Sequence, residues 1–358
     1  MEERGLSKEF LKGNEALAEA AVRAGCRFFA GYPITPQNEV PEYLSHRLPE
    51  VGGVFIQGES EIASIYMVYG AASVGIRSMT SSSGPGIALK TEGITYLAAA
   101  ELPAVIVDMQ RGGPAIGQVT VAQQDYLFVT RGAGPGGIRC FTFAPSDVQE
   151  LVDHTYRAFD IADKYRAPVF VLADAVTGNM MENVELPPMR DLEKLPKHED
   201  WKLTMRGEDG KARIIQSYNP VLEHAVDANK ALADKYQEWE DQLQEWEEYM
   251  LDDAECVIVA YGTTGRIAKS AVSKLRRNGV KAGLLRPISL YPFPKKAFAK
   301  LDYDKVKFIV SAEMSIPAQM FEDVDACVRD KAPIYKALSS GGVVIKESTI
   351  IDAVMERV

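Results

Sequence analysis

The sequence predicts an α/β protein with two units, in which helices alternate with the strands of a mostly parallel sheet. Its 358 residues exceed what one domain core commonly holds, so two units are expected. Helical and strand patterns alternate from residue 7 to residue 172, stop in a stretch rich in proline and charge, and restart near Glu255. We therefore predict a first unit at 1–184, a charged linker with a long helix at 185–250, and a smaller second unit at 251–358.

The first unit shows the alternation element by element. Apolar residues recur at helical spacing in the first helix, and the run "PAVIVDMQ" is an apolar strand, typical of a parallel sheet covered on both faces. In chain order we expect a helix at 7–24, a strand in "CRFFAG", a helix in "PQNEVPEYLSHRL", a strand in "GVFIQ", a helix in "SEIASIYMVYGAAS", a strand in "RSMTSSS", a helix in "GPGIALKTEGITYLAA", the strand "PAVIVDMQ", a long polar loop, a strand in "RCFTFA", a helix capped by Ser146, and a strand in "APVFVLAD".

The linker and the second unit follow. A helix is expected at 221–250, with one stripe of apolar residues interrupted by Asn229. Such a helix fits either a contact with another subunit or packing on its own chain. In the second unit we expect strands in "CVIVAYG", "VKAGLLRPISL" and "VKFIVSAEM" and a helix in "TGRIAKSAVSKLRRNG", opened by the turn-like "GTTG" at 262–265.

Composition limits the function classes. The net charge of −10 disfavours nucleic-acid binding, because an acidic surface repels phosphates. No apolar run reaches the roughly 18–20 residues of a membrane helix, and the N-terminus lacks the apolar core of a signal peptide, so we expect a cytoplasmic protein without a membrane span. The four cysteines are far apart with no C-x-x-C pair, so no metal or iron–sulfur site is expected within this chain.

Two candidate site stretches are loops that follow predicted strands, where open α/β sheets bind ligands. In "GYPITPQNE", Pro33 and Pro36 restrict the backbone, and Pro36 holds Thr35 extended. An ordinary structural turn is the alternative. In "DMQRGGPAIGQ", Arg111 enters a Gly-Gly-Pro turn, where it suits recognition of a carboxylate or a phosphate, with a structural ion pair as the alternative.

Two further candidate stretches open helices. In "GESEIASIYMVYG", Glu59 and Glu61 precede a helix that is otherwise apolar, where a carboxylate can act as a cap. In "TSSSGPGIALKTEG", small residues at a strand-to-helix turn leave backbone N–H groups open to a ligand, although a plain tight turn has the same pattern. The residues of this turn are Ser83, Gly84, Pro85 and Gly86. The lysine spacing excludes a P-loop.

Taken together, these motifs resemble a known enzyme family. Glu61, Gly70 nine residues later and "SSSGPGIALKTEGI" resemble the pyrimidine-binding domain of thiamine diphosphate enzymes. "GYPITP", "SEIAS…YGAASVG…TSSSGPG" and "QRGGP" are similar to the alpha subunit of 2-oxoacid:ferredoxin oxidoreductases, first of the 2-oxoisovalerate (branched-chain) type and then of the 2-oxoglutarate type. The C-terminal "IVAYGTTGRIAKSAV…GLLRPISLYPFP" resembles the smaller transketolase C-terminal-like domain of that family, so the resemblance covers nearly the whole chain.

The resemblance implies roles for the site residues. Glu61 matches the glutamate that hydrogen-bonds N1′ of the aminopyrimidine, with Glu59 the less well spaced alternative. Thr35 matches the threonine beside the substrate, together with Tyr32, Pro33 and Ile34. Arg111 matches the position that pairs with the substrate carboxylate. The list Ser83, Gly84, Pro85 and Gly86 matches the cofactor-binding turn.

The resemblance also implies partners. The G-D-G…N pattern that binds diphosphate and Mg²⁺ in the family has no match here, and no cysteine cluster can hold iron–sulfur centres. A beta subunit would supply diphosphate, Mg²⁺ and [4Fe-4S] sites, alongside a gamma subunit and a ferredoxin-like delta subunit or an external ferredoxin. The assembly would be a dimer of such heteromers, with CoA as co-substrate.

The expected reaction is oxidative decarboxylation of a 2-oxoacid to an acyl-CoA. The loop "GPAIGQVTVAQQDYLF" has no Lys or Arg between Arg111 and Arg131, which favours a branched-chain 2-oxoacid over 2-oxoglutarate. A transketolase-like or acceptor-independent decarboxylase and a non-catalytic scaffold subunit are the alternatives.

Overall fold

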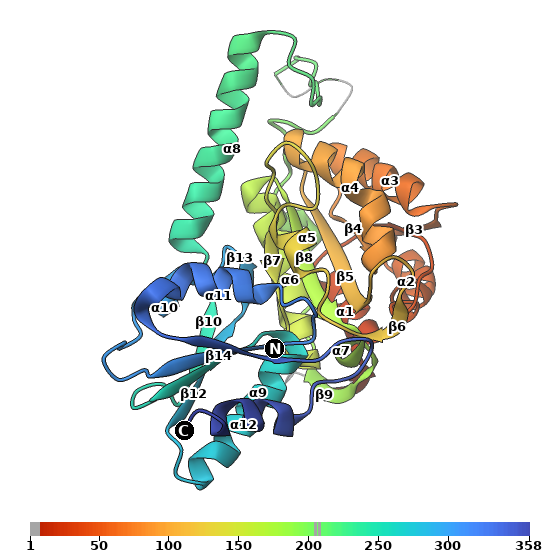
Figure 1. The fold of residues 1–358 in the computed structure, drawn as a ribbon. Coiled ribbons are helices and arrows are strands. Elements are labelled where there is room, and N and C mark those ends of the chain that lie inside the picture. The colour runs from red at the N-terminus through yellow and green to blue at the C-terminus, as the bar shows by residue number, and fades with distance from the viewer. Residues whose placement is uncertain (1–7, 204–205, 207–208) are drawn as a thin grey trace, which may run out of the picture.

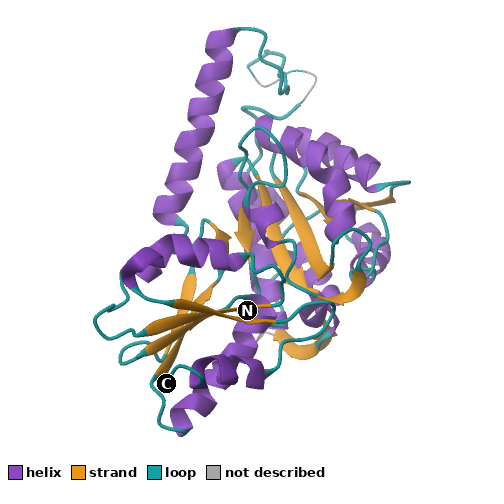
Figure 2. Cartoon of the chain, viewed as in Figure 1, coloured by secondary structure: helices purple, strands orange, loops and turns teal. Residues whose placement is uncertain are grey.

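A computed structural model gives the structure of the chain and describes residues 8–203, 206 and 209–358. Two layered α/β units are visible in Figure 1, with the first unit at the upper right and the C-terminal unit, in blue, at the lower left. Helices flank the strands of both units, as Figure 2 shows. This arrangement confirms the predicted α/β class.

The larger sheet carries the site. Neighbouring pairs among β3, β2, β4, β5, β8 and β7 are parallel, and β13 joins the edge antiparallel to β7. All nine residues of β5 are buried, as expected for a central strand covered on both faces. The strands in spatial order are β13 (Ser289–Tyr291), β7 (Phe141–Phe143), β8 (Pro168–Asp174), β5 (Ala104–Gly112), β4 (Ser78–Ser82), β2 (Phe28–Gly31) and β3 (Val54–Gln57), with β6 (Gln118–Val121) beside β5.

Two helical layers cover this sheet. One layer consists of α3 (Glu61–Ser73) and α4 (Gly84–Ala99), which lie side by side on one face. On the other face, α1 contacts both α2 and α6, and these helices enclose a separate apolar core with the inward side chains of the strands. The bounds of this second layer are α1 (Gly13–Arg23), α2 (Glu39–Glu50) and α6 (Val148–Tyr165).

The second unit is a five-stranded sheet in the order β10-β12-β11-β14-β15. Its central strands pair in parallel, and β10 closes one edge antiparallel to β12. The strands are β10 (Trp246–Tyr249), β12 (Ala282–Pro287), β11 (Cys256–Val259), β14 (Phe308–Glu313) and β15 (Ile334–Leu338). The helices are α9 (Gly262–Arg277), α10 (Lys295–Ala299), α11 (Met320–Val328) and α12 (Glu347–Met355), with a 3-10 turn η2 (Arg329–Lys331).

The long helix is shorter than predicted. Helix α8 (Leu222–Gln242) ends before the expected residue 250, because residues 246–249 form β10 at the edge of the second sheet. Near its C-terminal end, Trp239 is buried against the aromatic rings of Phe141 and Tyr165. Its first turns stand away from the body in Figure 1, and Leu222 there is 81% exposed.

Two predictions at helix N-termini were also wrong. The expected helix at 7–24 begins only at Gly13, since Lys8–Lys12 forms strand β1, which pairs antiparallel with β9 (Met181–Glu185); residue 7 lies outside the described residues. Asp147, not Ser146, caps α6, because its carboxylate accepts the Glu150 N–H at 2.8 Å.

The expected single strand "VKAGLLRPISL" breaks at Ile288 into β12 and β13, which belong to different sheets. The expected long loop contains β6 and the short helix α5 (Tyr126–Thr130). The remaining short elements are α7 (Ala175–Asn179) and the 3-10 turn η1 (Leu192–Lys194). Among the helices of the described residues, none is both long enough and apolar enough to cross a membrane.

Candidate active site

The candidate residues lie at the carboxyl ends of the parallel strands of the larger sheet. Strands β2, β4 and β5 are parallel neighbours, so the loops that follow them meet at their carboxyl ends. These loops carry Thr35, the turn at 83–86 and Arg111. Glu61 is the first residue of α3, which follows β3, the parallel neighbour of β2.

Arg111 connects two of these loops. Its side chain is 7% exposed, and its Nη1 and Nη2 donate to the carbonyl oxygens of Thr35 at 2.9 Å and Ile116 at 3.2 Å. Its buried Nε has no partner in the described structure. No carboxylate of the described residues forms an ion pair with this guanidinium within 4.0 Å, so its charge is available to a ligand.

The loop that carries Thr35 is anchored on its buried side and exposed on the other. Pro36 and Gln37 are buried, and the Asn14 Nδ2 donates to the Pro36 carbonyl at 2.9 Å. The Thr35 hydroxyl is exposed and accepts a 3.4 Å hydrogen bond from the Asn38 amide. The three residues before it lie on the outer side of the loop: Tyr32 and Pro33 are exposed and Ile34 is half-buried.

Glu61 is buried at the start of α3, with 7% of its surface exposed. Ser60 caps the helix by accepting the Ala63 N–H at 3.2 Å, so the helix does not need Glu61 as its cap. No described residue donates a hydrogen bond to the Glu61 carboxylate, which is therefore free to bind a ligand donor. Glu59, the alternative, is exposed and lies outside the helix.

The turn at 83–86 forms a close-fitting wall beside Glu61. A Cβ atom at Gly86 would lie 2.6 Å from Glu61 Oε1 and 2.1 Å from Ser82 Oγ, so only glycine fits there. The hydroxyl oxygens of Ser82 and Ser83 are buried without a partner in the described structure. Pro85 lies in the first turn of α4, where a missing N–H costs no helical hydrogen bond.

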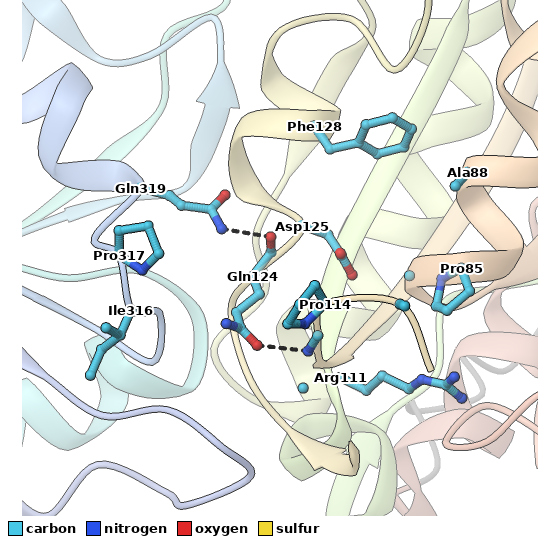
Figure 3. A pocket seen from close by; sticks show the side chains of 14 residues that line it. Pro85, Ala88, Arg111, Pro114, Gln124, Asp125, Phe128, Ile316, Pro317 and Gln319 are labelled. Carbon is cyan, nitrogen blue, oxygen red and sulfur yellow. Dashed lines mark hydrogen bonds between the residues drawn. The ribbon is translucent and has the colours of Figure 1, made fainter. Parts of the chain in front are cut away.

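A cavity of about 410 Å³ lies between the two units beside this edge. Figure 3 shows Pro85, Arg111 and Asp125 on its first-unit side and Ile316 and Pro317 across from them. The Gln319 amide nitrogen donates to the Gln124 carbonyl at 2.6 Å and thereby ties the second unit to the cavity wall. The lining residues are Gly84, Pro85, Ala88, Arg111, Gly112, Gly113, Pro114, Ala115, Gln124, Asp125, Phe128, Ile316, Pro317 and Gln319.

Two carboxyl groups under this edge were missed by the sequence reasoning. Asp108 is fully buried on β5, and burial together with the neighbouring Asp125 raises its pKa well above the usual range. Burial raises the pKa of Asp125 to about 6, against the opposing effects of the Gly84 N–H and the Arg111 charge. The polar interruption in "PAVIVDMQ" was the available signal for Asp108, whereas Asp125 falls in the segment that was expected to be a loop.

The turn "GTTG" is occupied by contacts between the units. Thr263 Oγ1 donates to Asp174 Oδ1 at 2.8 Å, and Thr264 Oγ1 donates to Gln123 Oε1 at 2.7 Å. These hydroxyls are buried against the first unit, so this turn is not an open phosphate site.

Comparisons with known proteins match this architecture. A family model described as "Pyruvate flavodoxin/ferredoxin oxidoreductase, thiamine diP-bdg" matches residues 19–250, and one described as "Pyruvate:ferredoxin oxidoreductase core domain II" matches residues 254–350. The ketoisovalerate oxidoreductase subunit VorB of Methanothermobacter marburgensis is 46% identical over 319 residues, which cover 89% of each chain. The 2-oxoglutarate synthase subunit KorA of Methanocaldococcus jannaschii is 37% identical over 374 residues, covering 97% of this chain and 99% of that protein.

Solved structures agree with these matches. The 2-oxoglutarate:ferredoxin oxidoreductase from Magnetococcus marinus, solved with 2-oxoglutarate, coenzyme A and succinyl-CoA bound, superposes with a TM-score of 0.86 at 26% identity. The match covers 98% of this chain but only 65% of that longer chain. A split-gene transketolase, at 14% identity and a TM-score of 0.60, shares the fold alone. The chain is therefore a member of the 2-oxoacid:ferredoxin oxidoreductase family and corresponds to the subunit with its thiamine diphosphate-binding domain.

Proposed function

We propose that this chain is the alpha subunit of an oxidoreductase that converts a branched-chain 2-oxoacid such as 2-oxoisovalerate and CoA to the acyl-CoA and CO₂. The two electrons released pass to ferredoxin, through partner subunits. The observation that carries the proposal is that Glu61, a buried carboxylate free to bind a donor, and Arg111, a guanidinium without an ion pair among the described residues, both lie after the carboxyl ends of strands of the same parallel sheet.

The residues present fit the pyrimidine end of thiamine diphosphate. Gly86 leaves room beside Glu61, and the unpartnered hydroxyl of Ser82 lies in the same region. Glu61 would hold a proton at the ring N1′, and Gly84, Pro85 and Gly86 would form the wall. When bound, the cofactor supplies a nucleophilic carbon and an electron sink for the loss of CO₂.

The loop residues would bind the substrate. Arg111 would pair with its carboxylate, because the rigid planar guanidinium matches two carboxylate oxygens. Its bond to the Thr35 carbonyl holds the Thr35 loop beside it, and Tyr32, Pro33 and Ile34 complete that wall. The buried Pro36 and Gln37 anchor the loop from behind, and its exposed face is open to a substrate or to a partner subunit.

The cavity beside Arg111 supports an apolar substrate. Ala88, Phe128, Ile316 and Pro317 line it, and Arg111 is its only cationic lining residue. A dicarboxylate such as 2-oxoglutarate would need a second cation, and Asp125 would repel its distal carboxylate. The 2-oxoglutarate type remains the second candidate, because the chain is 37% identical to a 2-oxoglutarate synthase subunit.

An exposed apolar surface supports the need for a beta subunit. Helices α3 and α4 are apolar on nearly all sides, a pattern typical of buried helices, yet their outer face is open. The exposed side chains of this face are Ile62 (47%), Tyr66 (38%), Leu89 (51%) and Tyr96 (39%). The face adjoins Glu61, so a beta subunit seated there would complete the active site.

The partner subunits would hold what this chain lacks. Among the described residues, no cluster of three or more His, Cys, Asp or Glu side chains is placed to hold a metal ion. Diphosphate, Mg²⁺ and [4Fe-4S] sites are assigned to the beta subunit, and further electron transfer to gamma and ferredoxin-like delta subunits or an external ferredoxin. The complex would be a dimer of these heteromers, and CoA would enter as co-substrate.

Glu61→Ala in the assembled complex tests this function. Loss of the proton-holding carboxylate should lower kcat for 2-oxoacid decarboxylation by a factor on the order of 10²–10⁴. Glu59→Ala, two residues away and exposed, is the matched control and should leave kcat unchanged. Full activity of the Glu61 variant would contradict the proposed mechanism and would leave the scaffold alternative. Purification of an active complex without any iron–sulfur protein would instead favour an acceptor-independent decarboxylase.

A further inference from the structure

A lysine lies buried beneath the proposed catalytic glutamate. The Lys90 side chain on α4 has 0% exposure, which is rare for a lysine. The contact of its Nζ in the described structure is a weak one, to the main-chain carbonyl oxygen of Glu61 at 3.5 Å. No carboxylate of the described residues pairs with this ammonium within 4.0 Å.

Two glycines bring Lys90 to this place. Gly86, Lys90 and Gly93 follow one another at spacings of four and three residues, so they share one face of α4. A Cβ atom at Gly93 would lie 2.4 Å from the Ile65 side chain, and one at Gly86 would lie 2.6 Å from Glu61 Oε1. This face therefore packs directly against the first turns of α3, and Lys90 lies between the two close approaches.

The buried charge of Lys90 destabilises the fold. Burial lowers the pKa of Lys90 to about 8, and the Glu61 charge opposes that decrease. The ammonium is thus mostly charged at neutral pH, in a place without a salt bridge, where an apolar side chain of similar volume would stabilise the fold. Asp108 and Asp125 lie beyond the N-terminal turn of α4, next to Gly84, and Glu61 is the group whose charge acts on Lys90.

We propose that Lys90 is a positioning residue for the proposed reaction, whose buried positive charge stabilises the carboxylate form of Glu61 and so favours proton transfer from Glu61 to the bound pyrimidine nitrogen. This inference rests on the proposed function of Glu61. The proton moves between the Glu61 oxygen and that nitrogen, while Lys90 keeps its own proton. A purely structural lysine would only donate a hydrogen bond to the Glu61 carbonyl.

Two substitutions separate these roles. Lys90→Met removes both the charge and the donor, whereas Lys90→Gln removes the charge and keeps an N–H donor on a side chain one atom shorter. In the assembled complex, both should lower kcat by about tenfold or more and leave KM for the 2-oxoacid within about twofold. Lys164→Met, at an exposed position on α6, is the control and should change neither constant. Wild-type kcat in the Gln variant would overturn the proposal.

The full chain without cofactor gives a test that does not depend on activity. Because its pKa is lowered on folding, Lys90 contributes stability that is present above its unfolded pKa and is lost as the pH falls through about 8. The melting temperature of Lys90→Met should therefore exceed that of wild type at pH 7, with the difference shrinking as the pH rises toward 10.5.

The same comparison, made in chains that also carry Glu61→Gln, tests whether the Glu61 charge acts on Lys90. Without the Glu61 charge, the folded-state pKa of Lys90 should fall further, so the difference between wild type and Lys90→Met should be larger at pH 7 and should reach its low-pH plateau at a lower pH. An unchanged difference at pH 7 in the Glu61→Gln background, or a difference that does not vary with pH, would overturn the inference. If the complex decarboxylates no 2-oxoacid at all, the proposed function fails, and this melting experiment still decides whether Lys90 and Glu61 are coupled.

Discussion

At the residue scale, two charged side chains at the cavity have polar atoms without a partner in the described structure. Arg111 uses two of its nitrogens on carbonyl oxygens and leaves its charge uncompensated. Asp125 lies at the cavity wall with its Oδ2 buried and unpartnered. A buried polar group without a partner costs stability, so such groups are expected where a ligand or another subunit completes them.

Replacing Arg111 with lysine should weaken substrate binding. Lysine keeps the charge but cannot hold both carbonyl oxygens and a carboxylate at once, so KM for the 2-oxoacid should rise about tenfold or more. Steady-state kinetics of the complex measure this directly. Arg131→Lys is the matched control, because Arg131 pairs with Asp323 on the surface and does not line the cavity. An unchanged KM in the Arg111 variant would remove this residue from the substrate site.

Asp125 should make stability fall as the pH rises. Its pKa is raised from 3.8 to about 6 on folding, so its stabilising contribution is full below pH 3.8 and is lost as the pH passes through about 6. Asp125→Asn should remove this pH dependence. Between pH 4 and pH 7, its free energy of unfolding should increase relative to that of wild type by on the order of 1 kcal/mol or more. Denaturant unfolding at several pH values measures the difference. Parallel profiles for the two proteins would contradict this assignment.

The sequence predicted those site residues that lie in a recognisable local motif. Thr35 between prolines, Glu61 before an apolar helix and Arg111 in a glycine turn each follow a strand of one parallel sheet, and the structure joins Thr35 and Arg111 by a hydrogen bond. Asp108 showed only as a polar interruption in an apolar strand, and Lys90 gave no signal. Their environment depends on which strands and helices become neighbours, and spacing along the chain does not contain that information.

At the element scale, the close packing of α3 on α4 sets the geometry around Glu61. The glycines of α4 allow this approach, and the sequence showed them only as a turn and a helix interior. Elements whose partners are distant in sequence were predicted least well. Strand β1 pairs with β9, more than 160 residues later, and a local helical pattern outweighed that pairing in the prediction.

Gly93→Ala should disrupt this packing. The added methyl group would lie 2.4 Å from the Ile65 side chain, so the helices must separate, at a cost of about 1–3 kcal/mol. Gly70→Ala on α3 is the control, because its added methyl group meets no atom within 4 Å and should stabilise the isolated chain by about 0.5–1 kcal/mol. Thermal unfolding of the isolated chain measures both. A Gly93 variant as stable as wild type would show that the two helices do not depend on this contact.

At the scale of the whole molecule, the second unit is joined to the first through buried polar contacts. Arg286 of β12 donates to Glu150 of α6 at 2.6 and 3.0 Å and to Glu247 at 2.8 Å. Strand β13 adds a second connection by extending the larger sheet. Ile316 and Pro317 of the second unit line the cavity, next to Gln319, whose amide donates to the Gln124 carbonyl. The sequence predicted the unit but not this exchange of a strand, because Ser289–Tyr291 continues the same apolar run as β12.

The central claim is that this chain holds half of an active site for a branched-chain 2-oxoacid. The most direct test is ferredoxin reduction coupled to CO₂ release, measured with 2-oxoisovalerate, 2-oxoglutarate and pyruvate, for the isolated chain and for the assembled complex. We predict no turnover by the isolated chain, and turnover by the complex with the highest kcat/KM for 2-oxoisovalerate. Full activity of the isolated chain, or a complex that reduces ferredoxin with none of the three substrates, would contradict the account.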